Sequence, residues 1–108
     1  MPWPPSRDLV VEAVTVTASG TMEIATDAVD FDSTTGTIAY VLPDPATMGN
    51  KKVALSLIAS ANPANAVTIT PAAGLIDGAA NLVLSVVGQS VEVCARSDVA
   101  IPNYRIQG

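Results

Sequence analysis

Polar and apolar residues alternate most clearly within residues 66–78, which read AVTITPAAGLIDG. Residues 67–70 alternate valine or isoleucine with threonine, and this period of two is typical of a half-buried β-strand. Pro71 ends the run, because proline has no N–H group to donate to a sheet. The small and glycine residues at 72–74 and the Asp-Gly pair at 77–78 predict two turns, between which the chain re-enters the apolar layer.

A near copy of this segment lies earlier in the chain, at residues 13–20 (AVTVTASG). Both copies run Ala-Val-Thr-(Val/Ile)-Thr and then reach a glycine. We interpret the two copies as a pair of strands to which the remaining strands of the fold are added.

Seven segments besides residues 66–78 show strand-like patterns, and the first of them overlaps the copy at residues 13–20; one of the seven is ambiguous. The predicted strands are residues 9–17, 21–26, 37–42, 51–61, 79–87, 90–96 and 104–107. Residues 51–61 also suit a short helix, but the Gly-Asn and Asn-Pro pairs that bound them resemble hairpin ends and favour a strand. The segments on either side of Gly88-Gln89 predict a β-hairpin.

Turn signals recur about every 8–12 residues, without a clear amphipathic helix, and this spacing is typical of all-β domains. We therefore predict a small antiparallel β-sandwich or barrel, jelly-roll-like in topology. Residues 9–108 form its single domain, since 108 residues suffice for one core but not for two. Residues 1–8 are predicted to be an extended arm.

The composition predicts an oligomer. Apolar residues make up 49% of the chain, but aromatic residues only 4% and charged residues only 14%. A core built mainly of alanine and valine buries little area, and at about 25 cal/mol per Å² it leaves a lone protomer with little stability in reserve. Few charges beside much apolar surface indicate that another copy covers part of that surface. We expect a homo-oligomer.

The charge and cysteine content exclude several classes of function. A net charge of −5 argues against nucleic-acid binding, which needs a basic surface. No apolar run approaches the roughly 18 residues of a membrane span, and the N-terminal MPWPPSRD lacks the apolar region of a secretory signal. The single cysteine, Cys94, allows no disulfide within the chain, so we expect synthesis in a reducing cytoplasm or folding independent of redox state.

The N-terminal arm carries the predicted partner-binding residues, Trp3, Pro4, Pro5 and Arg7. Its prolines favour the extended polyproline II conformation, and a Trp on a stiff segment loses little entropy when it docks. We expect the arm to dock on a neighbouring molecule; the alternative is a disordered tail with an incidental Trp.

No residue pattern predicts catalysis, a cofactor or a metal site. The chain has no His, which excludes Ser–His and Cys–His catalysis and most zinc sites. Asp30, Asp32 and Thr34 have the spacing that begins a calcium loop, but no Glu follows at its twelfth position, and a solvated loop is the better interpretation. We interpret Cys94 as a packing residue and Asp77 as a turn residue whose side chain bonds to its own backbone. We expect no enzyme and no bound cofactor.

Five segments together resemble a recurrent bacteriophage pattern. They are the VTVTASG strand (14–20), a strand ending in Leu-Pro (38–43), a Lys-rich strand start (51–57), the NAVTITP…IDG segment (65–78) and a late SVEV strand (90–93). The set is similar to the small β domain of head-decoration (cement), head-fibre and tail-fibre proteins of tailed bacteriophages.

This resemblance implies a trimeric structural protein of the virion, made in the host cytoplasm and placed on the capsid surface. The short chain suits a decoration or cement protein that binds the major capsid protein, with the arm reaching the shell or a neighbour. The alternative is a head-fibre or tail-fibre recognition module that binds a host surface glycan.

Overall fold

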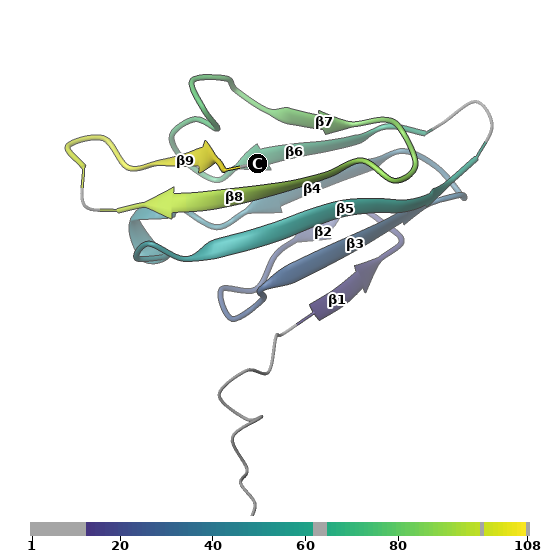
Figure 1. Cartoon of the computed structure of the whole chain (residues 1–108), viewed down its shortest axis with the longest axis horizontal. Helices are drawn as coiled ribbons and strands as arrows, with labels where there is room; N and C mark the ends of the chain where they lie inside the picture. Colours follow the sequence, from purple (N-terminus) through teal and green to yellow (C-terminus); the bar gives the residue numbers. More distant parts are fainter. Residues whose placement is uncertain (1–12, 62–64, 98, 108) are drawn as a thin grey trace, which may run out of the picture.

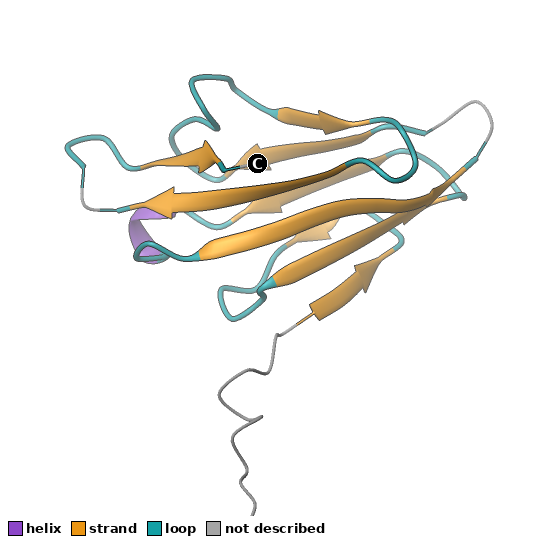
Figure 2. Ribbon diagram, in the orientation of Figure 1, coloured by secondary structure: helices purple, strands orange, loops and turns teal. Residues whose placement is uncertain are grey.

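The alternating segments form two β-sheets that face each other in the computed structural model, which describes residues 13–61, 65–97 and 99–107 (Figure 1, Figure 2). Sheet A contains, in spatial order, β1 (Ala13–Val16), β3 (Ala28–Ser33), β5 (Lys52–Ser60), β8 (Ser90–Arg96) and β9 (Asn103–Ile106). Sheet B contains β2 (Gly20–Thr21), β4 (Ile38–Leu42), β6 (Val67–Pro71) and β7 (Leu82–Leu84). The helical element within the described ranges is one 3₁₀ turn, Pro45–Thr47. The all-β prediction is confirmed.

The first six strands alternate between the two sheets, so that the chain winds through three successive coils. β1, β3 and β5 therefore pair in parallel in sheet A, and β2, β4 and β6 pair in parallel in sheet B. The prediction of an antiparallel, jelly-roll-like sandwich is wrong for this half of the molecule, and the two sheets do not close into a barrel. Each crossover carries the chain to the opposite sheet, whereas a hairpin would return it to the same one.

The last three strands add antiparallel edges. β7 pairs with β6 in sheet B, and β8 pairs with β5 in sheet A before β9 folds back on β8. The predicted hairpin around Gly88-Gln89 is wrong, because β7 and β8 lie in different sheets. The turn itself is present, since Gln89 N donates to Val86 O at 2.9 Å, but it carries the chain across the core.

The two similar segments do not pair with each other. Residues 13–16 form the edge strand β1 of sheet A, whereas residues 67–71 form β6 inside sheet B. Their shared pattern predicts two strands correctly, but the interpretation that they form a central pair is wrong. Residues 52–60 form the strand β5, as predicted in preference to a helix.

The core lies between the sheets and consists of the inward residues of both. Val29, Phe31, Leu55 and Leu57 from sheet A are fully buried, as the period-two pattern requires. The ring of Phe31 meets that of Tyr40 in sheet B edge to face, with ring centres 5.1 Å apart. This contact joins the two sheets at the centre of the core.

Two polar contacts hold the coils together. Ser33 is fully buried, and its hydroxyl donates to the Asn65 carbonyl at 2.8 Å, while the Asn65 side-chain amide donates to the Ser33 carbonyl at 2.7 Å. Lys51 Nζ lies 3.2 Å from Asp27 Oδ1 and donates to the Ile24 carbonyl at 2.7 Å. Lys51 therefore ties the β2–β3 connection to the start of β5.

The two edge strands of sheet A differ in what lies beside them. β1 is an edge strand of four residues whose side chains are mostly exposed, and within the described residues it pairs only with β3. β9, at the opposite edge, is covered by residues from the β6–β7 connection. There Tyr104 N donates to Leu75 O at 2.9 Å and Asp77 N donates to Tyr104 O at 2.7 Å. This segment bridges sheet A to sheet B beside a buried Ile76.

Candidate functional site

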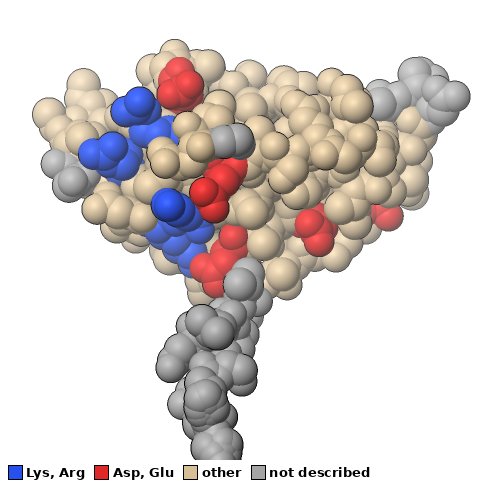
Figure 3. Space-filling view, viewed as in Figure 1, with Lys and Arg blue, Asp and Glu red and all other residues tan. Residues whose placement is uncertain are grey.

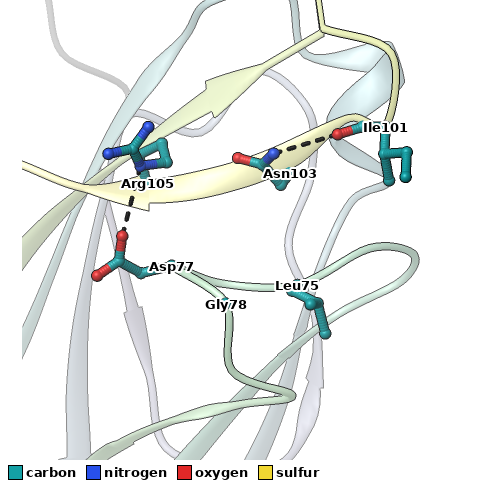
Figure 4. A pocket seen from close by; sticks show the side chains of 6 residues that line it. All are labelled: Leu75, Asp77, Gly78, Ile101, Asn103 and Arg105. Atoms are coloured by element: carbon teal, nitrogen blue, oxygen red, sulfur yellow. Dashed lines mark hydrogen bonds and ion pairs between the residues drawn. The ribbon is translucent and has the colours of Figure 1, made fainter.

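A pocket of about 230 Å³ lies where the β6–β7 connection covers β9 (Figure 4). Its lining residues come from two segments that are far apart in the sequence. They are Leu75, Asp77 and Gly78 from the connection and Ile101, Asn103 and Arg105 from β9 and the loop before it. Leu75 and Ile101 are largely exposed, at 45% and 76%, so the pocket mouth is apolar.

A tight turn shapes one wall of the pocket. Asp77 and Gly78 both have positive φ, 48° and 84°, which is the signature of a type I′ turn. Ile76 and Ala79 close the turn with two reciprocal backbone hydrogen bonds of 2.8 Å. Asp tolerates this region better than most residues, and Gly adopts it freely. The Asp-Gly turn predicted at residues 77–78 is confirmed.

Gly74 allows the two walls to approach each other. Its φ is +72°, and a Cβ atom at this position would lie 2.5 Å from the Pro102 carbonyl oxygen. Real Cβ atoms do not come this close to a backbone oxygen, so a larger residue would push the walls apart. The pocket is therefore built on a backbone contact that only glycine allows.

The polar groups of the pocket are one ion pair and one amide. Asp77 Oδ1 lies 3.4 Å from Arg105 Nε, and both side chains are about half exposed. Asn103 Nδ2 donates to the Ile101 carbonyl at 3.1 Å, as the dashed line in Figure 4 shows. Asn103 Oδ1, in contrast, is buried and has no hydrogen-bond partner. Such a group is expensive to leave unpaired, so it could accept a hydrogen bond from a further donor.

Tyr104 anchors β9 beneath the pocket. Its side chain is fully buried, and its hydroxyl donates to the Pro43 carbonyl at 2.7 Å, which ties β9 to the end of β4. Burial raises the pKa of the phenol far above its ordinary value, and the nearby Asp44 carboxylate raises that pKa further. The hydroxyl therefore stays protonated and keeps this hydrogen bond.

Removing this hydroxyl should weaken the fold in a way that depends on pH. We expect Tyr104→Phe to lower the free energy of unfolding by about 1–3 kcal/mol at neutral pH, since the Pro43 carbonyl is left without its donor. Because the pKa of Tyr104 is higher in the folded chain than in the unfolded one, its contribution is complete below about pH 10 and falls as the pH rises above that value. Urea unfolding at neutral and alkaline pH measures both effects. An equal alkaline loss in the variant would show that another group causes it.

A second candidate surface is the outer face of sheet B, whose strands contain no charged residue. None of the residues of β2, β4, β6 and β7 is charged, whereas the strands of sheet A include six charged residues. The outward residues of sheet B form two rows across the strands, Thr21–Val41–Thr70 and Ala39–Thr68–Val83. These side chains are small or β-branched, so none of them projects far from the sheet.

The outer face of sheet A has the opposite character. Lys and Arg side chains gather at one end of the face visible in Figure 3, with Asp and Glu side chains beside them and along its lower margin. The register contributes to this arrangement, because Lys52 pairs with Cys94 and Cys94 with Arg105 across the strands. Within the strands, charge is therefore confined to one of the two sheets.

The structure describes some of the predicted site residues and leaves others outside the described ranges. Trp3, Pro4, Pro5 and Arg7 lie outside the described residues, so the docking of the arm stays a prediction. Cys94 is buried, as expected of a packing residue.

The two predictions for aspartates also differ in outcome. Asp32 Oδ1 accepts hydrogen bonds from the Thr34 hydroxyl at 2.7 Å and the Thr34 N–H at 3.1 Å, and these bonds lower the pKa of the Asp32 carboxyl. Asp32 therefore closes the turn that follows β3, but Asp30 and Asp32 themselves lie in β3, so the interpretation of these two residues as part of a solvated loop is wrong. Asp77 sits in the predicted turn, but the bond shown for its carboxylate is to Arg105 and not to its own backbone.

Sequence reasoning missed the pocket residues Leu75, Ile101, Asn103 and Arg105 as a group. Only the Asp-Gly turn gave a local signal, and nothing in the sequence indicated that it would cover β9. The composition shows that the chain has few charged residues. It does not show that the strands of one sheet have none.

No family model matches the sequence, and no curated protein matches it either. Among the residues that the structure describes, no group of three or more Cys, Asp or Glu side chains could hold a metal ion. The same part of the chain contains no helix long and apolar enough to cross a membrane.

Proposed function

We propose that this chain is a structural protein of a tailed-bacteriophage virion, an oligomeric decoration or cement module that binds the major capsid protein on the outside of the head. In this proposal it is made in the host cytoplasm, assembles as a homotrimer and has no catalytic role. The observation that carries the proposal is the uncharged outer face of sheet B. The five sequence segments that resemble phage head-decoration and fibre proteins supply the class of partner.

An uncharged sheet face is typical of a surface that another protein covers. Antiparallel or mixed sheets exposed to water commonly carry polar and charged side chains on the solvent side. The centre of a protein interface, in contrast, is depleted of charge. Thr68, Thr70 and Val83 offer an uncharged surface from which a partner can displace water without burying a charge, which suits binding to a capsid subunit.

The buried aromatic residues favour capsid binding over glycan recognition. Glycan sites commonly use exposed aromatic rings as platforms, and Phe31, Tyr40 and Tyr104 are all buried in the core. The net charge of −5 likewise opposes a nucleic-acid partner inside the head. A decoration protein needs neither feature, because it binds by apolar contact and shape.

One charge placed on the sheet B face tests the proposal. Val83→Lys on β7 should weaken binding to capsids by about 100-fold, because the interface would bury an unpaired charge. Ile58→Lys on β5 is the matched control, since both side chains are apolar and about half exposed, at 44% and 49%. The control should bind as the original chain does. Binding is measured by co-sedimentation with heads of the encoding phage that were assembled without this protein.

Two further measurements make the result decisive. Circular dichroism must show that both variants are folded, and light scattering must show that their oligomeric mass is unchanged. Equal binding by Val83→Lys and the original chain would contradict the assignment of this face. If the original chain fails to bind the heads but binds a glycan array, the recognition-module alternative replaces the proposal.

A further inference from the structure

We propose that the pocket between Leu75 and Arg105 receives the side chain of Trp3 from a second copy of this chain, so that the arms link the copies head to tail. The inference rests on the proposed function only in assuming that the chain forms an oligomer. It concerns a different surface from the sheet B face. It identifies the occupant of the pocket and explains how the N-terminal arm contributes to assembly.

The chemistry of the pocket suits an indole ring. Leu75 and Ile101 supply apolar walls at its mouth, and Arg105 supplies a guanidinium group, which binds favourably to aromatic faces. Asn103 Oδ1 is a buried acceptor without a partner. The indole N–H is a donor and has no acceptor function, so it can pair with an acceptor such as this atom and brings no unpaired acceptor of its own.

The composition of the chain leaves one candidate for this role. The chain has four aromatic residues, and three of them, Phe31, Tyr40 and Tyr104, are already buried in the core. The fourth is Trp3, which lies between Pro2 and Pro4. Proline neighbours restrict the backbone, so less entropy is lost when the Trp side chain binds. Trp is also the residue type most enriched among binding hot spots.

The positions of arm and pocket favour a second copy over the same chain. The arm precedes Ala13 at the β1 edge of sheet A, and the pocket lies at the β9 edge. These edges are four strand spacings apart, about 19 Å. The arm could span this distance, since ten extended residues reach about 33 Å. To do so, however, it would have to turn and cross the outer face of β3, β5 and β8.

A second copy places the two surfaces side by side. The β1 edge of one copy then faces the β9 edge of the next, which is a heterologous contact, and such contacts close into rings when the rotation permits. A three-membered ring of this kind is the trimer of the proposed function. Each copy in it both donates an arm and receives one. Every pocket is therefore occupied, and every Trp3 side chain is bound.

The experiment uses the fluorescence of Trp3, the only Trp in the chain. In the full-length protein, assembly measured by light scattering should coincide with a blue shift of the Trp emission. Ile101→Asp should weaken assembly by about 30-fold or more and return the emission to that of a solvated indole. Trp3→Ala should weaken assembly equally. Val86→Asp is the matched control, because Val86 is also a highly exposed apolar loop residue, at 64%, and it should change neither measurement.

Mixing the two disabled variants identifies the donor of the arm. Ile101→Asp keeps an intact arm and Trp3→Ala keeps an intact pocket, so together they should form a 1:1 pair with a blue-shifted emission. A blue shift in a monomer would show docking within one chain and overturn the proposal. A solvated Trp3 in the assembled protein, or assembly unaffected by Ile101→Asp, would also overturn it. Capsid binding is not part of this readout, so failure here is distinguishable from failure of the proposed function.

Discussion

Replacing Phe31 with alanine is expected to lower the free energy of unfolding by about 3–5 kcal/mol. The Phe31 ring is fully buried at the centre of β3, between Val16 on β1 and Leu57 on β5, and it meets Tyr40 across the core. Because the rest of the core consists mostly of aliphatic side chains, nothing nearby is large enough to fill the cavity. For a domain at the lower end of the usual range of total stability, about 5 kcal/mol, this loss leaves a large fraction of the variant unfolded at 37 °C.

Two substitutions separate this effect from a general loss of apolar residues. Phe31→Leu keeps most of the volume and should lower the free energy of unfolding by about 1–1.5 kcal/mol. Ile58→Ala, on an exposed position of β5, should change it by less than about 0.5 kcal/mol. Urea unfolding followed by circular dichroism measures the free energy of unfolding of all three variants. The protein concentration is kept the same, because assembly into an oligomer adds to stability. A Phe31→Ala loss no greater than that of Ile58→Ala would contradict the placement of Phe31 at the core centre.

Most strands could be predicted from the sequence because their signal is local, but β3 (Ala28–Ser33) was not among the predicted strands. A period of two shows which residues of 67–71 face the core, and the buried Val67 and Ile69 with the more exposed Thr68 and Thr70 agree with it. The same reasoning located the strands at 38–42, 52–60 and 90–96 to within a few residues. It was weaker at residues 21–26, where Met22 is buried but Ile24 is exposed and the strand is only two residues long.

The pairing of the strands could not be predicted in the same way, because it depends on where each connection goes. Short turns between apolar runs usually indicate hairpins, and this rule produced the antiparallel prediction. In the structure, the turn at Gly88-Gln89 bonds instead to β5, since Gly88 N donates to Leu57 O at 2.8 Å. That contact joins residues 31 positions apart, and no local pattern reports it.

The same limit applies to the candidate sites. The Asp-Gly turn at 77–78 was predictable from its own two residues, but its pairing with Tyr104 and Arg105 brings together residues nearly thirty positions apart. The uncharged face likewise emerges only when the strands are assigned to sheets. Both surfaces are long-range properties of the fold, and for this reason the binding residues predicted from the sequence lie in the arm and on neither surface.

The pocket itself should depend on Gly74 much more than on Gly78, although both have positive φ. An alanine at either position must adopt the left-handed region, at about 1–2 kcal/mol. At Gly78 the added Cβ meets nothing within 4 Å, so this strain is the whole effect. At Gly74 it also collides with the Pro102 carbonyl at 2.5 Å, and the total loss in the free energy of unfolding should reach about 3 kcal/mol.

The two glycine variants also differ in what they do to the pocket. Because Gly74→Ala separates the wall that carries Leu75 from the loop that carries Ile101, the emission of Trp3 should shift toward that of a solvated indole, whereas Gly78→Ala should leave it unchanged. Urea unfolding and Trp emission, recorded on both variants, measure the two effects independently. Equal losses of stability would contradict the close contact between the walls. A loss of stability at Gly74 without a change in emission would instead separate that contact from arm docking, because the walls would then matter for the fold and not for Trp3.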